Sequence, residues 1–341
     1  MTVHGNDRDA RAAATCRPLR RLTARRGWAG VLCLALALFV APPAAAAQPA
    51  PVVEPRAKPP AAVPAIPPAT VRVVDDVVES AALGRRMPYR VLLPAGYDMG
   101  MRRYPVLYLL HGLTGAHSDW ESRTRLADHL RPFELVVVMP EGQNSWYADA
   151  AANPADKFET YIQDDLVADV QKKYRVLATR HGRAIAGLSM GGYGAMKFAL
   201  KRPDRFVVAG SLSGALGAAR PPASSTPART EPPTPFQRTV QESMEAAFGP
   251  PGSPGRTAHD LFALVEKADP ARLPYLYLDC GTEDGLLEVN REFTALLRVR
   301  KIAYEYHEVP GAHTWDYWDR QAIQLLHVLA RGMQLGRPPT H

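Results

Sequence analysis

A serine flanked by glycines stands in the middle of the chain. The stretch Gly187-Leu188-Ser189-Met190-Gly191 follows an apolar run and precedes a helix-like run of small residues. A sharp turn from a strand into a helix strains the serine backbone and leaves no room for side chains two positions away, which explains the two glycines. Such a turn holds a hydroxyl out at the end of a strand. We therefore interpret Ser189 as a candidate nucleophile.

Two later segments carry the side chains that a nucleophilic serine needs. A serine hydroxyl is a weak nucleophile until a base takes its proton and an acid orients that base. Asp284 follows the apolar run PYLYLD, and His313 follows the run IAYEYHEV. The order Ser189, Asp284, His313 is the order of a catalytic triad in this strand–turn–helix setting. We predict His313 as the base and Asp284 as the acid, and we favour Asp284 over the neighbouring Glu283, which would point elsewhere.

Backbone N–H groups are needed to stabilise the oxyanion that such an attack creates. Met190 directly follows the nucleophile and offers one N–H. The segment LLHGLTG follows an earlier strand, and its turn offers a second N–H, which we assign to Leu113. His111 lies in the same turn, and we expect it to pack or to hydrogen-bond there, not to act as a base.

Other residues of the sequence bear on the substrate and on cofactors. Trp146 and Tyr147 follow a strand end in GQNSWYAD and are candidates for the lining of a substrate pocket, with a plain packing role equally open. The sequence contains no H-E-x-x-H, P-loop or dinucleotide-binding motif, so we expect no metal and no other cofactor. Among the cysteines, Cys280 ends an apolar run and is expected to be a buried structural thiol.

The candidate residues require a sheet whose strand ends meet at one edge. Short apolar runs without polar alternation, typical of strands buried on both faces, occupy 104–110, 134–139, 183–188, 205–212, 274–279 and 302–309. Helix-like stretches lie between or after them, near 157–174, 190–202, 286–300 and 315–333. The alternation predicts an α/β fold, a mostly parallel central sheet with helices on both faces. The earlier segments 70–80 and 87–94 are predicted to form an antiparallel hairpin at its edge.

One segment interrupts this pattern. Residues 214–257 contain nine prolines and little apolar periodicity, apart from a possible helix at 237–248. Proline limits the accessible conformations, so we expect little regular structure in the remainder. A long segment of this kind inside a compact domain is usually functional or disordered. Since it follows the strand after the serine turn, we expect it to overhang the site and to select substrates.

Charge and composition limit the class of partner. Of the formal net charge of +7, residues 1–47 contribute +5, from seven arginines and two aspartates, which leaves about +2 for the rest of the chain. Such a small excess gives no reason to expect a nucleic-acid partner. Residues 48–70 are rich in Pro and Ala and are predicted to be an extended linker. Residues 71–335 then have the composition of one folded domain, which we expect to be the catalytic domain.

Residues 1–47 have the three parts of a signal peptide. Arginines precede an apolar run at 28–40, and small residues at 44–48 provide a cleavage site, expected after Ala47. The apolar run is shorter than the ~20 residues that span a bilayer, which argues against a retained membrane anchor. We expect an exported protein, periplasmic or secreted, with no stable membrane insertion after cleavage.

Six segments of the chain together resemble the esterase D group of α/β-hydrolases. In chain order they are YLLHGLTG, MPEGQNSWYAD, ETYIQDDLVADVQKKY, IAGLSMGGYGAMKFAL, DCGTEDGLL and PGAHTWDYW. The group includes S-formylglutathione hydrolases, bacterial carboxylesterases, feruloyl-esterase-like enzymes and mycolyltransferases. The resemblance covers roughly residues 70–335. It implies an α/β-hydrolase fold, together with the same triad and the same two backbone donors.

The resemblance leaves more than one function open. We favour a serine carboxylesterase that hydrolyses small-molecule carboxylic esters or thioesters through an acyl-enzyme. An acyltransferase of the mycolyltransferase type would use the same intermediate, with an alcohol in place of water. The export leader and the Pro-rich segment argue against a third alternative, an S-formylglutathione hydrolase. The intact triad argues against a fourth, a binding protein without activity.

The leader generates a testable prediction. We expect the exported protein to begin near Gln48, because the small residues before it form the cleavage site. N-terminal sequencing of protein from the exported fraction measures this directly. Recovery of a chain that retains residues 28–40 in the membrane fraction would contradict the prediction.

Overall fold

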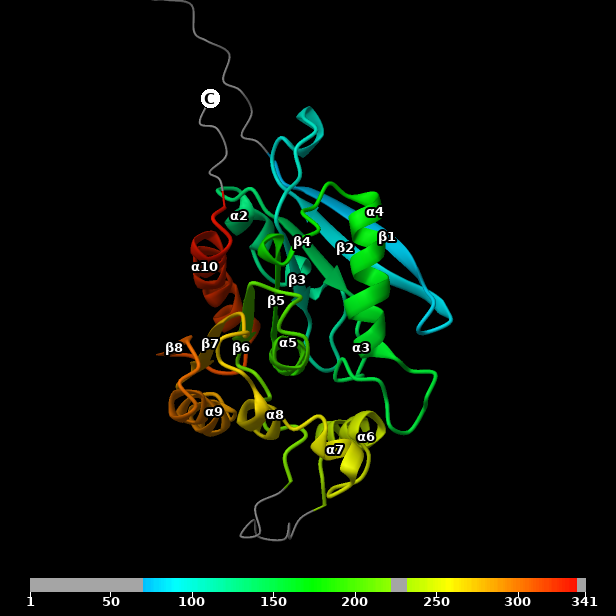
Figure 1. Cartoon of the computed structure of the whole chain (residues 1–341), viewed down its shortest axis with the longest axis vertical. Coiled ribbons are helices and arrows are strands. Elements are labelled where there is room, and N and C mark those ends of the chain that lie inside the picture. The colour runs from blue at the N-terminus through cyan, green and yellow to red at the C-terminus, as the bar shows by residue number, and fades with distance from the viewer. Residues whose placement is uncertain (1–69, 222–231, 336–341) are drawn as a thin grey trace, which may run out of the picture. The chain divides into compact units, whose positions relative to one another are not determined.

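The computed structural model of the protein describes residues 70–221 and 232–335 (Figure 1). The predicted leader, almost all of the predicted linker and part of the Pro-rich segment lie outside the described residues. Within the described ranges, none of the helices combines the length and the apolar character that crossing a membrane requires.

An eight-stranded sheet forms the centre of the described part, with the strand order β1-β2-β4-β3-β5-β6-β7-β8. The pairs β1–β2 and β2–β4 are antiparallel, and every other neighbouring pair is parallel. The strands are β1 (Arg72–Ser80), β2 (Arg85–Leu93), β3 (Val106–Leu110), β4 (Val136–Pro140), β5 (Arg183–Leu188), β6 (Val208–Leu212), β7 (Tyr275–Gly281) and β8 (Tyr304–Val309). This arrangement confirms the predicted parallel sheet and its antiparallel edge hairpin.

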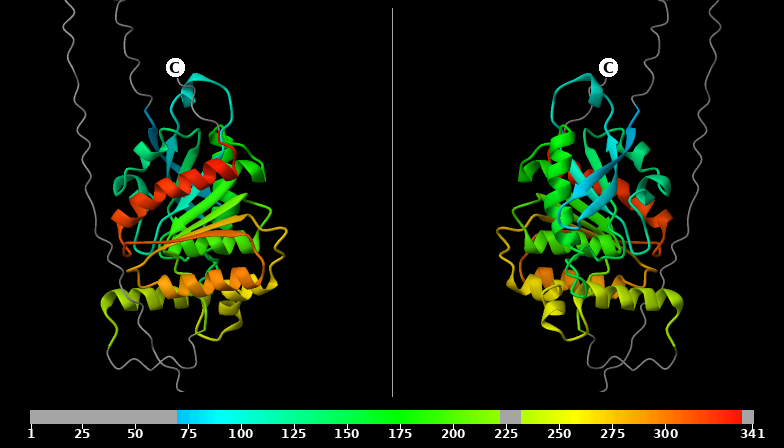
Figure 2. Two further views of the ribbon diagram at one scale, coloured as in Figure 1. Left: turned by 90° about the vertical axis from the view of Figure 1, so that its left-hand side faces the viewer. Right: turned by 90° about the vertical axis from the view of Figure 1, so that its right-hand side faces the viewer.

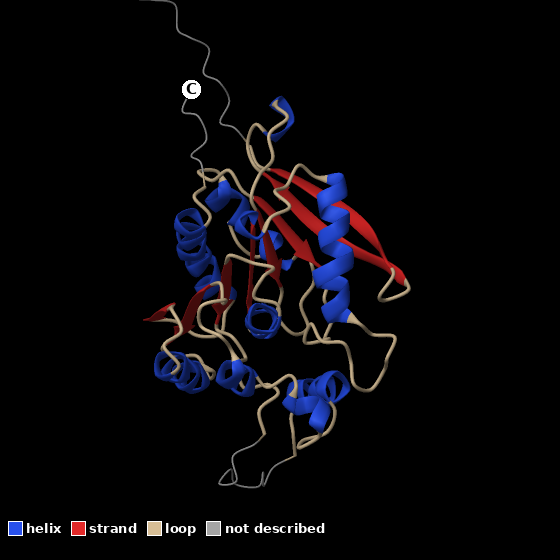
Figure 3. Ribbon diagram, viewed as in Figure 1, coloured by secondary structure: helices blue, strands red, loops and turns tan. Residues whose placement is uncertain are grey.

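Helices cover both faces of the sheet (Figures 2 and 3). They are η1 (Tyr97–Met99), α1 (Asp119–Ser122), α2 (Leu126–Leu130), α3 (Phe158–Thr160), η2 (Tyr161–Leu166), α4 (Val167–Lys173), η3 (Arg180–Gly182), α5 (Met190–Lys201), α6 (Pro235–Phe248), α7 (Pro254–Thr257), α8 (Leu261–Lys267), α9 (Leu287–Val299) and α10 (Trp315–Gly332). Residues of α4, α5, α8 and α9 belong to the core on one face, and residues of α1, α2 and α10 to the core on the other.

Strand β3 shows why the apolar runs lack polar alternation. Tyr108 and Leu110 pack into the core on the α5 face, and Leu107 and Leu109 pack into the core on the α10 face. All five residues of β3 are buried, because helices cover both sides of the strand. A strand in this position must be apolar at every residue.

The Pro-rich segment is more regular than the sequence suggested. The structure confirms a helix near 237–248, as α6, and adds the short helix α7. Pro235 and Pro254 are the first residues of these helices, where the missing N–H has no intrahelical partner to lose. Thr234 caps α6, since its hydroxyl accepts the Gln237 N–H at 3.2 Å. Pro254 therefore starts a helix in a part of the segment where we expected little regular structure.

A carboxyl group is buried in the sheet at Asp279, in β7. Its Oδ1 accepts a hydrogen bond from the Tyr317 hydroxyl of α10 at 2.9 Å. Burial raises the pKa of Asp279 to about 7, despite this bond. An aspartate in the unfolded chain has a pKa of about 3.9. Between these two values the folded protein holds a proton that the unfolded chain has released, so this group makes the fold less stable as the pH rises.

We expect Asp279→Asn to remove that pH dependence, because an amide has the same shape and carries no charge at any of these pH values. The stability of the variant relative to the parent should increase by on the order of 2 kcal/mol between pH 5 and pH 8. Urea unfolding at both pH values measures the difference, with the exposed Asp204→Asn as the control for losing a carboxylate. If the free energy of unfolding of Asp279→Asn differed from that of the parent by the same amount at pH 5 and pH 8, the prediction would be contradicted.

Candidate active site

Ser189 lies between β5 and α5 in a strained backbone conformation. Its φ is 52° and its ψ is −114°, a region that residues other than glycine rarely occupy. Such strain persists where the surrounding structure holds it in place, and it is concentrated at functional sites. The side chain is presented at the edge where β5 ends.

Close backbone packing around this turn explains its glycines. A Cβ on Gly191 would lie 2.5 Å from the carbonyl oxygen of Leu110 at the end of β3. A Cβ on Gly187 would lie 2.6 Å from the carbonyl carbon of Gly191. Backbone atoms at these distances cannot move aside without displacing β3 or α5. Any larger residue at either position would therefore change the position of Ser189.

The structure brings together the three side chains that the sequence singled out. The Ser189 hydroxyl and His313 Nε2 are 3.0 Å apart, and His313 Nδ1 and Asp284 Oδ2 are 2.8 Å apart. Asp284 is the buried end of this chain of hydrogen bonds, with 1% of its side chain exposed. The three residues follow β5, β7 and β8, whose ends meet at one edge of the parallel sheet.

The environment of Asp284 favours its charged form. Burial opposes ionisation, but the hydrogen bond with His313 and a second one from the Leu286 N–H, at 2.8 Å, outweigh it. Together they hold the pKa of Asp284 below its usual range. Glu283, the less favoured candidate, has an exposed side chain. The structure thus pairs His313 with Asp284.

The loop that carries His313 is held by close contacts on two sides. A Cβ on Gly281 would lie 2.1 Å from the Gly311 carbonyl oxygen, so glycine at the end of β7 lets this loop approach. The Glu283 N–H donates to the same carbonyl at 2.9 Å. The imidazole ring of His313 packs edge-on against Trp318, with ring centroids 4.9 Å apart. These contacts restrict the orientation of the imidazole.

A cavity of about 870 Å³ opens beside this hydrogen-bonded chain, and Ser189 and His313 line it. One wall belongs to α6, which contributes the apolar side chains Phe236, Val240 and Met244. These residues recur every four positions and so share one face of the helix. The Pro-rich segment therefore contributes to the site through α6.

Trp146 and Tyr147 have different surroundings. Trp146 lines the cavity, and its indole N–H donates to the Ser243 hydroxyl of α6 at 2.9 Å. Tyr147 has the packing role that the sequence also left open: it is completely buried, it does not line the cavity, and its hydroxyl donates to the His111 carbonyl at 2.9 Å. Both residues have a φ of 53°. This left-handed turn sends neighbouring side chains to different places, which the sequence alone did not reveal.

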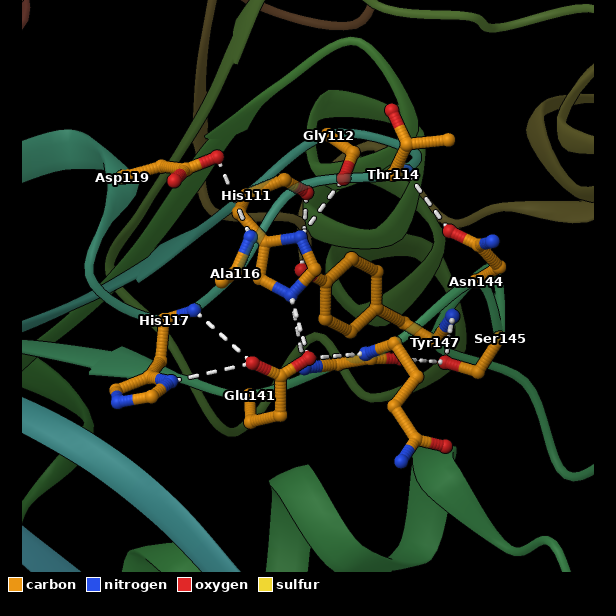
Figure 4. Close-up of polar contacts among 12 residues, drawn as sticks. His111, Gly112, Thr114, Ala116, His117, Asp119, Glu141, Asn144, Ser145 and Tyr147 are labelled. Atoms are coloured by element: carbon orange, nitrogen blue, oxygen red, sulfur yellow. Dashed lines mark hydrogen bonds and ion pairs between the residues drawn. The ribbon is translucent and has the colours of Figure 1, made fainter. Parts of the chain in front are cut away.

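The two residues that we predicted as backbone donors, Leu113 and Met190, are both close to Ser189. Leu113 lines the cavity, and a Cβ on Gly112 would lie 3.5 Å from Ser189 Cβ. Met190 is the first residue of α5, where an N–H has no acceptor within the helix. His111 hydrogen-bonds within its turn, with Nδ1 2.7 Å from the Gly112 carbonyl oxygen (Figure 4).

Residues 70–221 and 232–335 contain no group of three or more His, Cys, Asp or Glu side chains arranged to hold a metal ion. Cys280 is fully buried as a free thiol, and burial raises its pKa to about 12. A thiol in this state is a poor nucleophile.

Sequence reasoning missed some of the residues around the cavity. The apolar face of α6 could have been found, because Phe236, Val240 and Met244 repeat with helical spacing inside the helix that was expected there. Asn144 carries no such signal. It stands in a polar loop after β4, outside the cavity lining, and its Oδ1 accepts the Thr114 N–H of another loop at 2.7 Å.

Comparisons with known proteins give a consistent result. The model of a family described as "Putative esterase" matches residues 80–328. An acetyl esterase of Caldicellulosiruptor saccharolyticus is 28% identical over 231 residues, which are 65% of this chain and 82% of that protein. Esterase Rv1288 of Mycobacterium tuberculosis (strain ATCC 25618 / H37Rv) is 30% identical over 70% of this chain, but the match spans 54% of that protein's length.

A solved structure has the same fold. It is FphF of Staphylococcus aureus, described as a fluorophosphonate-binding serine hydrolase, with a TM-score of 0.65 and 26% sequence identity. The similarity covers 76% of this chain and 98% of that one. The α/β-hydrolase fold implied by the sequence motifs is thereby confirmed.

Proposed function

The chain belongs to the esterase family of ester-hydrolysing enzymes, and from this premise we propose that it is an exported serine carboxylesterase that works through an acyl-enzyme on Ser189. The observation that carries the proposal is the hydrogen-bonded chain from Ser189 through His313 to Asp284 beside the cavity. Export is inferred from residues 1–47, which lie outside the described residues.

The first half of the proposed reaction forms the acyl-enzyme. Ser189 Oγ attacks the carbonyl carbon of the ester while His313 Nε2 takes the hydroxyl proton. The carbonyl oxygen becomes negative and accepts hydrogen bonds from the backbone N–H groups of Leu113 and Met190. The C–O bond to the alcohol then breaks, and the alcohol leaves with the proton from His313.

The second half returns the enzyme to its starting state. A water molecule gives a proton to His313 and attacks the acyl carbon, through a second oxyanion held by the same donors. The bond to Ser189 Oγ breaks, Ser189 recovers the proton and the carboxylic acid leaves. Throughout, the Asp284 carboxylate accepts the Nδ1–H bond of His313 and stabilises its cationic form. The lowered pKa of Asp284 supports this role, because the group must stay ionised.

The side chains that line the cavity indicate which class of ester would fit it. Its α6 wall presents Phe236, Val240 and Met244, and Trp146 adds an aromatic ring. Apolar side chains favour an apolar acyl or aryl group, since its transfer from water into the cavity is favourable. We therefore propose small-molecule esters whose acyl or alcohol part is apolar, with α6 setting the size that fits.

The assignment of the nucleophile can be tested by substitution and labelling. Ser189→Ala should lower kcat for a nitrophenyl ester by roughly 10⁴–10⁶-fold, as loss of a triad serine does, with an unchanged circular dichroism spectrum. Mass spectrometry should find the adduct of a serine-directed phosphonate on Ser189. The partly buried Ser118→Ala outside the cavity is the control and should keep parental activity. An adduct on a different serine would refute the assignment.

The role of α6 predicts opposite effects from two substitutions at one position. Met244→Trp should reduce the space available, so kcat/KM for an octanoyl ester should fall about 10-fold relative to an acetyl ester. Met244→Ala should shift the preference towards the longer chain. Steady-state kinetics over a series of nitrophenyl esters measures both, with the exposed Glu242→Ala of the same helix as the control. Identical chain-length profiles for all variants would show that α6 does not select substrates.

A further inference from the structure

The peptide groups on both sides of Leu113 are held by hydrogen bonds. On the preceding side, the Gly112 carbonyl oxygen lies 2.7 Å from His111 Nδ1 and accepts the Gly115 N–H at 3.1 Å. On the following side, the Thr114 N–H donates to Asn144 Oδ1 at 2.7 Å. Figure 4 shows that Asn144 reaches Thr114 from the loop after β4.

The partners of His111 determine which of its nitrogens carries the proton. The Gly142 N–H donates to Nε2 at 2.9 Å and is closer to this nitrogen than Glu141 Oε1 at 3.4 Å, so Nε2 acts as an acceptor. Nδ1 then carries the hydrogen and donates it to the Gly112 carbonyl. The imidazole thereby joins the loop after β3 to the loop after β4.

Peptide geometry transmits this constraint to the Leu113 N–H. In a trans peptide unit the carbonyl oxygen of one residue and the N–H of the next point in opposite directions. Because the Gly112 oxygen is held towards the His111 ring, the Leu113 N–H must point away from that ring. The direction of the Leu113 N–H therefore depends on the hydrogen bonds that hold the peptide groups before and after Leu113.

The second of these peptide groups ends at Thr114, whose backbone conformation is strained. Thr114 has a φ of 61°, and a β-branched residue is a clear outlier at positive φ. Thr114 is exposed, so burial of its side chain does not hold this conformation. The Asn144 carbonyl is the side-chain acceptor that meets the strained N–H.

We propose that Asn144 is a positioning residue for the reaction: by holding Thr114 in its left-handed conformation, it keeps the Leu113 N–H aligned with the oxyanion. The inference rests on the proposed function, since it presumes that Leu113 is an oxyanion donor. Asn144 acts through the backbone and does not line the cavity.

The loop that carries Asn144 is itself well supported. The Glu141 carboxylate accepts the Gln143 N–H at 2.8 Å and the His117 N–H at 3.1 Å. His117 Nδ1 also lies 3.1 Å from this carboxylate. Glu141 thus forms another link between the two loops and fixes the position from which Asn144 reaches Thr114.

A double-mutant cycle tests the proposal. Asn144→Ala should lower kcat for nitrophenyl acetate by roughly 10- to 100-fold with KM changed less than about 3-fold, because the lost alignment matters most in the transition state. Thr114→Gly should be within about 3-fold of the parent, since glycine adopts positive φ without strain. In the Thr114→Gly background, Asn144→Ala should then lower kcat less than about 3-fold.

A matched control exists in the same region of the chain. Asn153 is also exposed, and its Oδ1 accepts a backbone N–H, from Ala155 at 3.2 Å. Asn153→Ala removes an equivalent bond, together with the Nδ2 hydrogen bond to Asp156 at 2.7 Å, and should still leave kcat within about 2-fold of the parent. A general loss of loop stability, by contrast, would make Asn144→Ala lower kcat equally in the parental and the Thr114→Gly backgrounds.

The outcomes separate the positioning role from the proposed function. An Asn144→Ala variant with parental kcat, or with the same loss in both backgrounds, would overturn the positioning role while the parent remains an active esterase. If Asn144→Ala does not fold, the comparison of Thr114→Gly with the double variant decides, and a loss above 10-fold there would refute the role. A parent that neither hydrolyses the ester nor reacts with the phosphonate would refute the proposed function itself.

Discussion

The site depends on a backbone constraint at Ser189. The chain must leave β5, turn and enter α5 within a single residue of positive φ, while the turn is in contact with the end of β3. Gly187 and Gly191 make that contact possible, because their missing side chains are replaced by backbone atoms of the neighbouring segments. The strain at Ser189 is maintained by burial of the surrounding strands. The hydroxyl therefore has a fixed position relative to the adjoining strand ends.

Parallel strand order turns this local constraint into a complete site. The ends of β3, β5, β7 and β8 share one edge, so loops far apart in sequence contribute Leu113, Ser189, Asp284 and His313 to neighbouring positions. The buried side chain of Asp284 and the more exposed His313 form a polar line into the cavity. The lowered pKa of Asp284 keeps its carboxylate charged at the buried end of this line. The apolar side chains of α6 form an apolar wall of the same cavity.

The sequence determines the sheet and the family well, and the side-chain surroundings less well. Apolar runs buried on both faces have a clear pattern, and the strand-end positions of Ser189, Asp284 and His313 follow from it. The sequence left the pocket and packing roles of Tyr147 equally open, because two consecutive residues of positive φ have no reliable sequence signal. The helix that starts at Pro254 was not expected, since a proline breaks a helix interior but is well suited to the first position of a helix. The contact of Asn144 with Thr114 joins two loops 30 residues apart, and no local pattern records it.

The central claim is that an acyl-enzyme forms, and partitioning of that intermediate tests it most directly. Esters of one carboxylic acid with different alcohols are hydrolysed in the presence of methanol, and the ratio of methyl ester to free acid is measured for each. A shared acyl-enzyme has lost its original alcohol before water or methanol attacks. We expect the same product ratio for every leaving group. A ratio that changes with the leaving alcohol would contradict it.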